Sequence, residues 1–442
     1  MRTYLSLART AAILAALSLV ACGKEDPRFF YERKPIPGLP YQGFRQDIPN
    51  ERRGNAAFSK GVFTAEGRYL VTLASGIQVW DAATGALLRT LPASLDGNDP
   101  IVADGTHHLV LAKRGDVAPH LPDAMGYWIW DMRDGSRRGP IPEGTWPAKR
   151  TSPVGITPRG EAVVLREGRI ETWRLDGSGP RLTLAAPPGR RFCMLYDPIA
   201  HDKQCAELSR SGRWLALTDR DTADNRAAPW TWLADLDRGT LRRVTLPDSV
   251  DVRSGRQGFA FSPDEQTLAM QAGDGMWIGY PVDGDAVAGQ AGRFVRGEHQ
   301  RNLFLLPITY TADGKRIVAM GDQMTVATYD ASTGALVGRV KPPFEDHEGA
   351  LRVSTDGSRA IAYRYVADIL VVIDGITGTQ RGYVCPYFCN RAHNPVDVPY
   401  AISPDGRRVA TGGRLGAGLW DTDADTLIAP LVDPTRAPLK PR

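Results

Sequence analysis

Short β-prone apolar runs alternate with turn residues along most of the chain. Eight variations on Ser403-Pro-Asp-Gly406 recur, and each precedes an apolar run such as Tyr69-Leu-Val-Thr-Leu73. Proline fixes φ at the first corner of such a turn, and glycine supplies the positive φ that reverses the chain. Each turn therefore predicts a tight hairpin between two strands. The turns begin at Thr64, Val102, Thr157, Ser209, Ser262, Thr311, Ser354 and Ser403.

A second signature follows each hairpin. It is a further β-prone run that usually ends in Asp, followed by a turn with Gly and a fourth run, as in Ile77-Gln-Val-Trp-Asp81 with Thr84-Gly85. Together the two signatures predict a four-stranded unit that repeats eight times. Tryptophans recur on the third strand, where we expect them to pack between units. They are Trp80, Trp130, Trp173, Trp232, Trp277 and Trp420.

The paired signatures resemble those of WD-repeat and YVTN-type β-propellers. The resemblance implies an all-β fold over residues 51–432, a β-propeller of eight four-stranded antiparallel meanders, with seven blades as the alternative. The Gly-His dipeptide of standard WD repeats is absent, which favours a divergent or YVTN-like group. Ring closure is open at this stage. Residues 44–63 could add a strand to the last blade, or the blades could meet end to end.

The N-terminus has the pattern of a bacterial export signal. Arg2 and Arg9 precede an apolar run over residues 10–21, which is shorter than the ~20 residues that span a bilayer as a helix. Leu19-Val-Ala-Cys22 resembles the lipobox of bacterial lipoproteins, which implies removal of residues 1–21 and lipidation of Cys22. The alternative is an ordinary secretory signal with a chance cysteine.

This resemblance places the protein in the cell envelope, facing the periplasm. Gly23 follows the cysteine where Asp would favour inner-membrane retention, so the family rule favours the outer membrane. Residues 22–50 are proline-rich and charged, which is typical of an extended tether. Residues 433–442 form a short C-terminal tail.

The order of strands in a meander assigns every loop to one of two faces. First-to-second and third-to-fourth turns share one face, here called the smooth face. Second-to-third loops and connections between blades share the other, the elaborated face. Binding residues favour loops on a rigid scaffold, so we expect the elaborated face to be the working surface, although neutral drift of surface loops is the alternative. The long insertions assigned to this face are 113–127, 185–206, 218–229, 286–307, 341–350 and 384–399.

Four cysteines fall on the elaborated face. An even number of cysteines in a secreted protein predicts disulfides, here Cys193–Cys205 and Cys385–Cys389, although four cysteines allow three connectivities. Closing these loops would pre-organise their aromatic side chains for a partner. The candidate partner-binding residues are Tyr196, Tyr387, Phe388 and His393.

Catalytic signatures are missing from the sequence. It holds no Gly-x-Ser-x-Gly elbow, no phosphate loop and no dinucleotide fingerprint, and no two histidines on the elaborated face share a metal-ligand spacing. Lys and Arg total 54 against 50 Asp and Glu in 442 residues, which gives no case for nucleic acid. We therefore expect no metal and no cofactor.

The resulting hypothesis is a lipid-anchored, non-catalytic scaffold with a monomeric body that binds proteins during cell-envelope assembly or interaction. Two stretches, 80–88 and 329–336, are also similar to quinoprotein repeats. That similarity leaves a periplasmic quinoprotein-like oxidoreductase, or a metal- or ligand-binding propeller, as the alternative. Enzyme activity is left open, and a non-catalytic protein is the favoured expectation.

Overall fold

A computed structural model describes most of the repeat region. The described residues are 56, 58, 60–74, 76–92, 101–113, 126–142, 151–166, 168–176, 178–192, 205–223, 229–245, 257–272, 275–282, 293–296, 308–320, 325–341, 349–364, 367–384, 400–412, 417–424 and 426–435. They contain strands and turns and no helix. Within these ranges, no helix is long and apolar enough to cross a membrane.

The first four blades follow one another along the chain. Blade 1 is β1 (Lys60–Phe63), β2 (Tyr69–Leu73), β3 (Ile77–Asp81) and β4 (Leu87–Leu91). Blade 2 is β5 (Val102–Asp104), β6 (Leu109–Lys113), β7 (Gly126–Asp131) and β8 (Arg137–Pro142). Blade 3 is β9 (Thr151–Ile156), β10 (Glu161–Arg166), β11 (Arg169–Arg174) and β12 (Pro180–Ala185). Blade 4 is β13 (Arg190–Phe192), β14 (Ala206–Leu208), β15 (Trp214–Asp221), β16 (Thr231–Asp235) and β17 (Thr240–Val244).

The other four blades complete the ring. Blade 5 is β18 (Gln257–Phe261), β19 (Thr267–Ala272), β20 (Gly275–Pro281) and β21 (Arg293–Arg296). Blade 6 is β22 (Ile308–Tyr310), β23 (Arg316–Met320), β24 (Val326–Asp330) and β25 (Leu336–Val340). Blade 7 is β26 (Gly349–Val353), β27 (Arg359–Arg364), β28 (Ala367–Asp374) and β29 (Thr379–Val384). Blade 8 is β30 (Tyr400–Ile402), β31 (Arg408–Thr411), β32 (Gly418–Asp421) and β33 (Thr426–Pro430).

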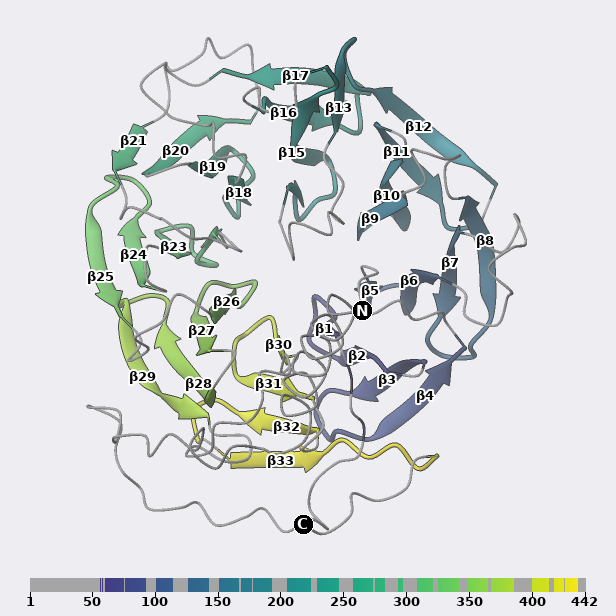
Figure 1. Cartoon of the computed structure of the whole chain (residues 1–442), viewed down its shortest axis with the longest axis vertical. Helices are drawn as coiled ribbons and strands as arrows, with labels where there is room; N and C mark the ends of the chain where they lie inside the picture. Colours follow the sequence, from purple (N-terminus) through teal and green to yellow (C-terminus); the bar gives the residue numbers. More distant parts are fainter. Residues whose placement is uncertain are drawn as a thin grey trace, which may run out of the picture.

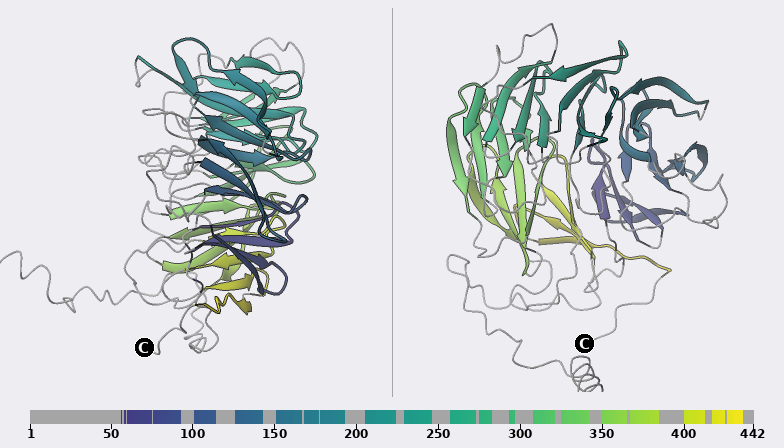
Figure 2. Two further views of the ribbon diagram at one scale, coloured as in Figure 1. Left: turned by 90° about the vertical axis from the view of Figure 1, so that its right-hand side faces the viewer. Right: turned by 45° about the horizontal axis from the view of Figure 1, so that its top comes forward.

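The eight sheets form an eight-bladed β-propeller, which confirms the predicted fold class. Neighbouring strands of each sheet pair antiparallel, for example Leu70 with Trp80 between β2 and β3. In the seven four-stranded blades the first strand lies towards the centre of the ring and the last strand at the rim (Figure 1). Seen from the side, the ring is a disc whose strands run between its two faces (Figure 2).

Ring closure takes place end to end. β1 pairs with β2 in blade 1, so the idea that residues up to 63 supply a strand of the last blade is wrong for Lys60–Phe63. Two hydrogen bonds join blade 1 to the end of blade 8. The Ala56 N–H donates to the Leu431 carbonyl at 3.1 Å, and the Gln78 amide donates to Asp433 at 2.6 Å.

The core lies between blades. Second and third strands such as β2 and β16 are buried along their whole length because each is covered by the blade on either side. Trp80, Trp130 and Trp420 are almost fully buried, and each clusters with apolar residues of the preceding blade. Trp173 and Trp232 do the same, which confirms the expected packing for five tryptophans. The side chain of Trp277 lies outside the described residues.

One predicted turn is out of register. Val102–Asp104 forms β5, and the chain reverses after it, over residues 105–108. His108 occupies the left-handed region there, with φ of 57°, where other blades use glycine, such as Gly67 with φ of 70°. The Val-Ala-Asp-Gly sequence imitates the repeat signature but belongs to the strand.

Two predicted insertions contain strands. Residues 185–206 include β13, which pairs with the end of β15 and extends blade 4 towards the elaborated face. Residues 286–307 include β21, which pairs with β20 as the fourth strand of blade 5, so this stretch does not lie wholly between blades as predicted.

Candidate functional site

The indole N–H of a third-strand tryptophan needs an acceptor because it is buried between blades. In blade 4 the acceptor is Asp219, which lies on β15 two residues beyond Leu217, the partner of Trp232. Trp232 Nε1 donates to Asp219 at 2.7 Å, and the Trp230 backbone N–H donates to the same carboxylate at 2.8 Å. Asp219 has no solvent exposure. A buried carboxylate of this kind requires a counter-ion.

Arg190 supplies that counter-ion from β13. Its guanidinium donates to both oxygens of Asp219, with Nε 2.8 Å from Oδ2, and its side chain is 6% exposed. The buried pair is thus bidentate and fully hydrogen-bonded on the carboxylate side. It fixes β13 to blade 4 at the end nearest the elaborated face.

Trp230 forms the outer part of this cluster. Its partly exposed ring lies between two guanidinium groups, that of Arg190 at 4.1 Å and that of Arg243 at 3.9 Å from the ring centroid. Both distances are in the range of cation–π interactions. Arg243 is exposed on β17, so the stack holds a charged group in place at the surface.

Blade 3 contacts the short strand β13. The turn from β10 to β11 touches β13, because a Cβ atom on Gly168 would lie 3.4 Å from the Cβ of Arg191. Arg169, next in the chain, is exposed, and so is Arg191. Across the described residues, neither side chain has an ion pair or hydrogen bond. We call Arg190, Trp230 and Arg243 the blade 3–4 edge. Arg191 follows Arg190 on β13 and therefore lies on the opposite face of that strand.

On the smooth face, several carboxylates are bonded by neighbouring side chains of their own turns. Asp330 accepts hydrogen bonds from Ser332 and Thr333, and these bonds hold its pKa well below the usual range. Asp131 accepts bonds from Arg133, which likewise lower the pKa of that carboxyl. These two carboxylates stabilise the fold at pH values above the pKa of an aspartate in the unfolded chain, near 4. Their contribution is lost as the pH falls through their lowered pKa values in the folded protein.

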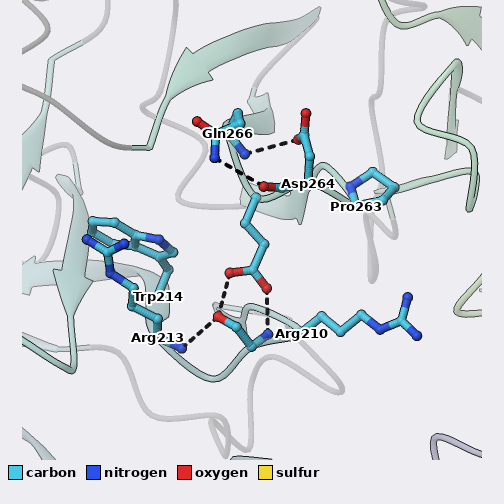
Figure 3. A pocket seen from close by; sticks show the side chains of 8 residues that line it. Arg210, Arg213, Trp214, Pro263, Asp264 and Gln266 are labelled. Carbon is cyan, nitrogen blue, oxygen red and sulfur yellow. Dashed lines mark hydrogen bonds between the residues drawn. The ribbon is translucent and has the colours of Figure 1, made fainter.

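A hollow of about 520 Å³ lies on the smooth face between the first turns of blades 4 and 5. Arg213 stacks on Trp214 at one side, and Asp264 and Gln266 form the other (Figure 3). Glu265 bridges the two turns, since it accepts bonds from the hydroxyls of Ser209 and Ser211. Its φ of 56° places a non-glycine residue in the left-handed region to make this bridge. The Glu265 side chain therefore crosses the hollow and joins the turns on its two sides.

Most of the sequence-predicted site residues lie outside the described residues. They are Cys22, Cys193, Cys385, Cys389, Tyr196, Tyr387, Phe388 and His393. Cys205 is described: it is 8% exposed and disulfide-bonded, and its carbonyl accepts from the Thr218 N–H at 3.0 Å. Its pairing with Cys193 stays a prediction. Within the described ranges, no group of three His, Cys, Asp or Glu side chains is arranged to hold a metal ion.

Sequence reasoning missed Arg190 and Asp219. The available signal was an acidic residue two positions after the apolar run Trp214-Leu-Ala-Leu217, at the end of a strand expected to be buried. Its partner lies 29 residues away in the chain, in a segment taken for a loop.

No family model matches the chain, and no curated protein sequence matches it. Among solved structures it is similar to a chain of "Crystal Structure of Mitotic Checkpoint Complex", with 13% identity and a TM-score of 0.46. The match covers 73% of this chain and 89% of that chain. A match at this level carries no argument about function.

Proposed function

We propose that the protein is a lipid-anchored, periplasm-facing scaffold that binds other proteins through the elaborated face of its propeller. The anchor in this proposal is Cys22 of the lipobox-like sequence, followed by the proline-rich tether of residues 22–50. In this proposal the propeller body provides a rigid binding surface.

The contrast between the two faces supports the proposal. On the smooth face, several charged side chains pair with one another, as in Arg213 with Asp235 at 2.9 Å and Arg316 with Asp330 at 2.5 Å. At the blade 3–4 edge, arginines and a partly exposed tryptophan stand on a buried, fully bonded base. Arginine and tryptophan are enriched at the energetic centres of protein interfaces, where rigid support lowers the entropy cost of binding.

Crosslinking in cells tests the scaffold. A photo-crosslinking amino acid is placed at Thr245, which is exposed just after β17 on the elaborated face, and in a second strain at Ala83, exposed on the smooth face. We expect discrete protein adducts from Thr245 and few from Ala83. Adducts from neither position, or equal adducts from both, would contradict the proposed function.

The anchor is tested separately with Cys22→Ala. The unmodified protein should fractionate with membranes and carry acyl chains at its mature N-terminus by mass spectrometry. The variant should lose the acyl chains and move to the soluble fraction, because several acyl chains dominate membrane affinity. Membrane association that is unchanged in the variant would remove the anchor from the proposal.

A further inference from the structure

The large apolar side chains that are exposed in the described residues lie in one half of the ring. They belong to blades 6, 7, 8 and 1, which follow one another across the seam, and the described residues of blades 2 to 5 expose none. Single exposed apolar residues are ordinary on a protein surface, but their confinement to one side indicates a surface for contact. They are Leu88, Leu336, Val337, Ile376, Ile428 and Val432.

Two of these residues hold the same position in neighbouring blades. The register of β4 on β3 skips Leu88, and the register of β33 on β32 skips Ile428, so each is the extra residue of a β-bulge. Both lie on outermost strands at the rim of the ring (Figure 1). Leu88 is 49% exposed and Ile428 is 39% exposed. Because the two blades repeat one geometry around the ring, both side chains project from the same level of the rim.

A close contact across the seam brings these two positions near each other. A Cβ atom on Gly85, in the turn before β4, would lie 2.7 Å from the Cβ of Ala429, which follows Ile428 on β33. Val432, just beyond the end of β33, is 46% exposed. We call Leu88, Ile428 and Val432 the seam patch.

The described part of the chain begins beside the seam patch. The Ala56 N–H donates to the carbonyl of Leu431, the residue before Val432, at 3.1 Å. A tether that runs from Cys22 to Ala56 therefore joins the propeller next to the patch, whereas blades 4 and 5 lie across the ring (Figure 1). A patch in this place can reach the bilayer without the tether passing round the body.

Carboxylates described near the patch are hydrogen-bonded within the protein. Asp81 accepts bonds from the backbone N–H and the hydroxyl of Thr84, each at 2.8 Å. Asp433 accepts bonds from the Gln78 amide and from the Thr435 hydroxyl, each at 2.6 Å. Carboxylates that are bonded in this way depend less on water, so they oppose the approach of a lipid surface less than free carboxylates do.

From this placement we infer that the seam patch rests on the lipid bilayer to which Cys22 anchors the chain, with its apolar side chains inserted among the lipids. The attraction of a surface to a bilayer grows with the apolar area that it buries, and the anchor keeps the patch at high local concentration above the membrane. The opposite side of the ring, with the blade 3–4 edge, then faces away from the bilayer. The inference rests on the proposed anchor and adds the orientation of the body.

Photo-crosslinking to lipid tests the contact. The purified acylated protein is reconstituted in vesicles of phosphatidylethanolamine and phosphatidylglycerol, with a photo-crosslinking amino acid at Leu88 or Ile428. The control position is Thr240, which is exposed at the start of β17 on blade 4. We expect lipid adducts, measured by intact mass, in about tenfold higher yield at Leu88 and Ile428 than at Thr240. Equal yields at all positions would mean that the body turns freely and would overturn the inference.

Charge substitutions test whether the apolar side chains make the contact. With the photo-crosslinking amino acid at Val432, the double variant L88E/I428E should lose most of its lipid adducts, because carboxylates resist transfer out of water. The matched control T240E/T245E adds the same charge at two exposed positions of blade 4 and should crosslink like the parent. Equal yields in the two double variants would overturn the inference. Thermal melting shows that each variant is folded.

The crosslinked products separate this inference from the proposed anchor. Adducts of the seam patch with a second copy of the chain, or with another protein when the experiment is repeated in cells, would replace the bilayer as its partner and overturn the inference. Acylated protein that gives no lipid adduct at Ile428 would leave the anchor standing and remove the contact. A mature protein without acyl chains would remove the anchor, and with it the contact that rests on it.

Discussion

Two pairs of blades differ in the acceptor that they provide for a buried indole N–H group: blades 1 and 8 use a hydroxyl, and blades 3 and 4 use a carboxylate. In each, a third-strand tryptophan buries its indole N–H between blades. Trp80 donates to the Thr72 hydroxyl at 2.8 Å, and Trp420 donates to that of Thr411 at 2.9 Å. Trp173 and Trp232 donate instead to the carboxylates of Glu171 and Asp219.

The choice of acceptor decides what the rest of the blade must contain. A hydroxyl is satisfied inside the core, but a buried carboxylate needs a cation within reach. Blades 3 and 4 therefore bring Arg166 and Arg190 to the elaborated face. Asp219 occupies the position on its strand that Thr72 and Thr411 hold in theirs, so a single acidic residue turns a core contact into the base of a surface site.

Removing the most deeply buried carboxylate should have the largest effect. Asp219→Ala leaves Arg190 uncompensated and two N–H groups without an acceptor, so we expect a loss of about 3–5 kcal/mol in the free energy of unfolding. Urea denaturation followed by tryptophan fluorescence measures it. A loss below about 1 kcal/mol would show that the pair does not stabilise blade 4 in this way.

The equivalent change in blade 3 should cost less. Glu171→Ala removes the acceptor of Trp173, but the Arg166 side chain is 20% exposed and can turn to solvent. We expect about 2 kcal/mol, measured in the same denaturation series. If Glu171→Ala proved as costly as Asp219→Ala, exposure of the arginine would not explain the difference between the blades.

The hydroxyl sites should be less sensitive still. Thr72→Val and Thr411→Val keep the shape of the side chain and remove the acceptor, which costs about 1–2 kcal/mol for a buried N–H left unpaired. Thr72→Ser, which keeps the hydroxyl, is the control and should lose less. Equal losses for valine and serine would assign the effect to packing.

The smallest expected change in the free energy of unfolding is in blade 2, and there the substitution should stabilise the protein. Ala112 stands where blades 1 and 8 have threonine, and within the described residues the Trp130 indole N–H has no hydrogen-bond partner. Ala112→Thr should therefore be about 1 kcal/mol more stable than Ala112→Val, which adds the same volume without a hydroxyl. Two variants of equal stability would mean that the hydroxyl does not reach the indole.

The repeat made the architecture predictable, because the same pattern recurs eight times and local errors do not accumulate. The turn at Val102 was misplaced, since His108 supplies the positive φ that the pattern assigns to Gly105. The Arg190–Asp219 base was not predictable. It joins a short strand inside an insertion to the end of another strand, and nothing in a periodic signature marks that pairing. The lipid anchor at Cys22 stays a prediction from the sequence.

The end-to-end closure of the ring has a mechanical consequence. Every blade is one uninterrupted stretch of chain, so no sheet crosses the seam between blades 8 and 1. Ala56 is the first residue that the structure describes, and its bond to Leu431 and the bond from Gln78 to Asp433 lie across that seam. With the proposed anchor in place, a pull on the N-terminus would therefore load the junction of blades 8 and 1 before it strained any sheet.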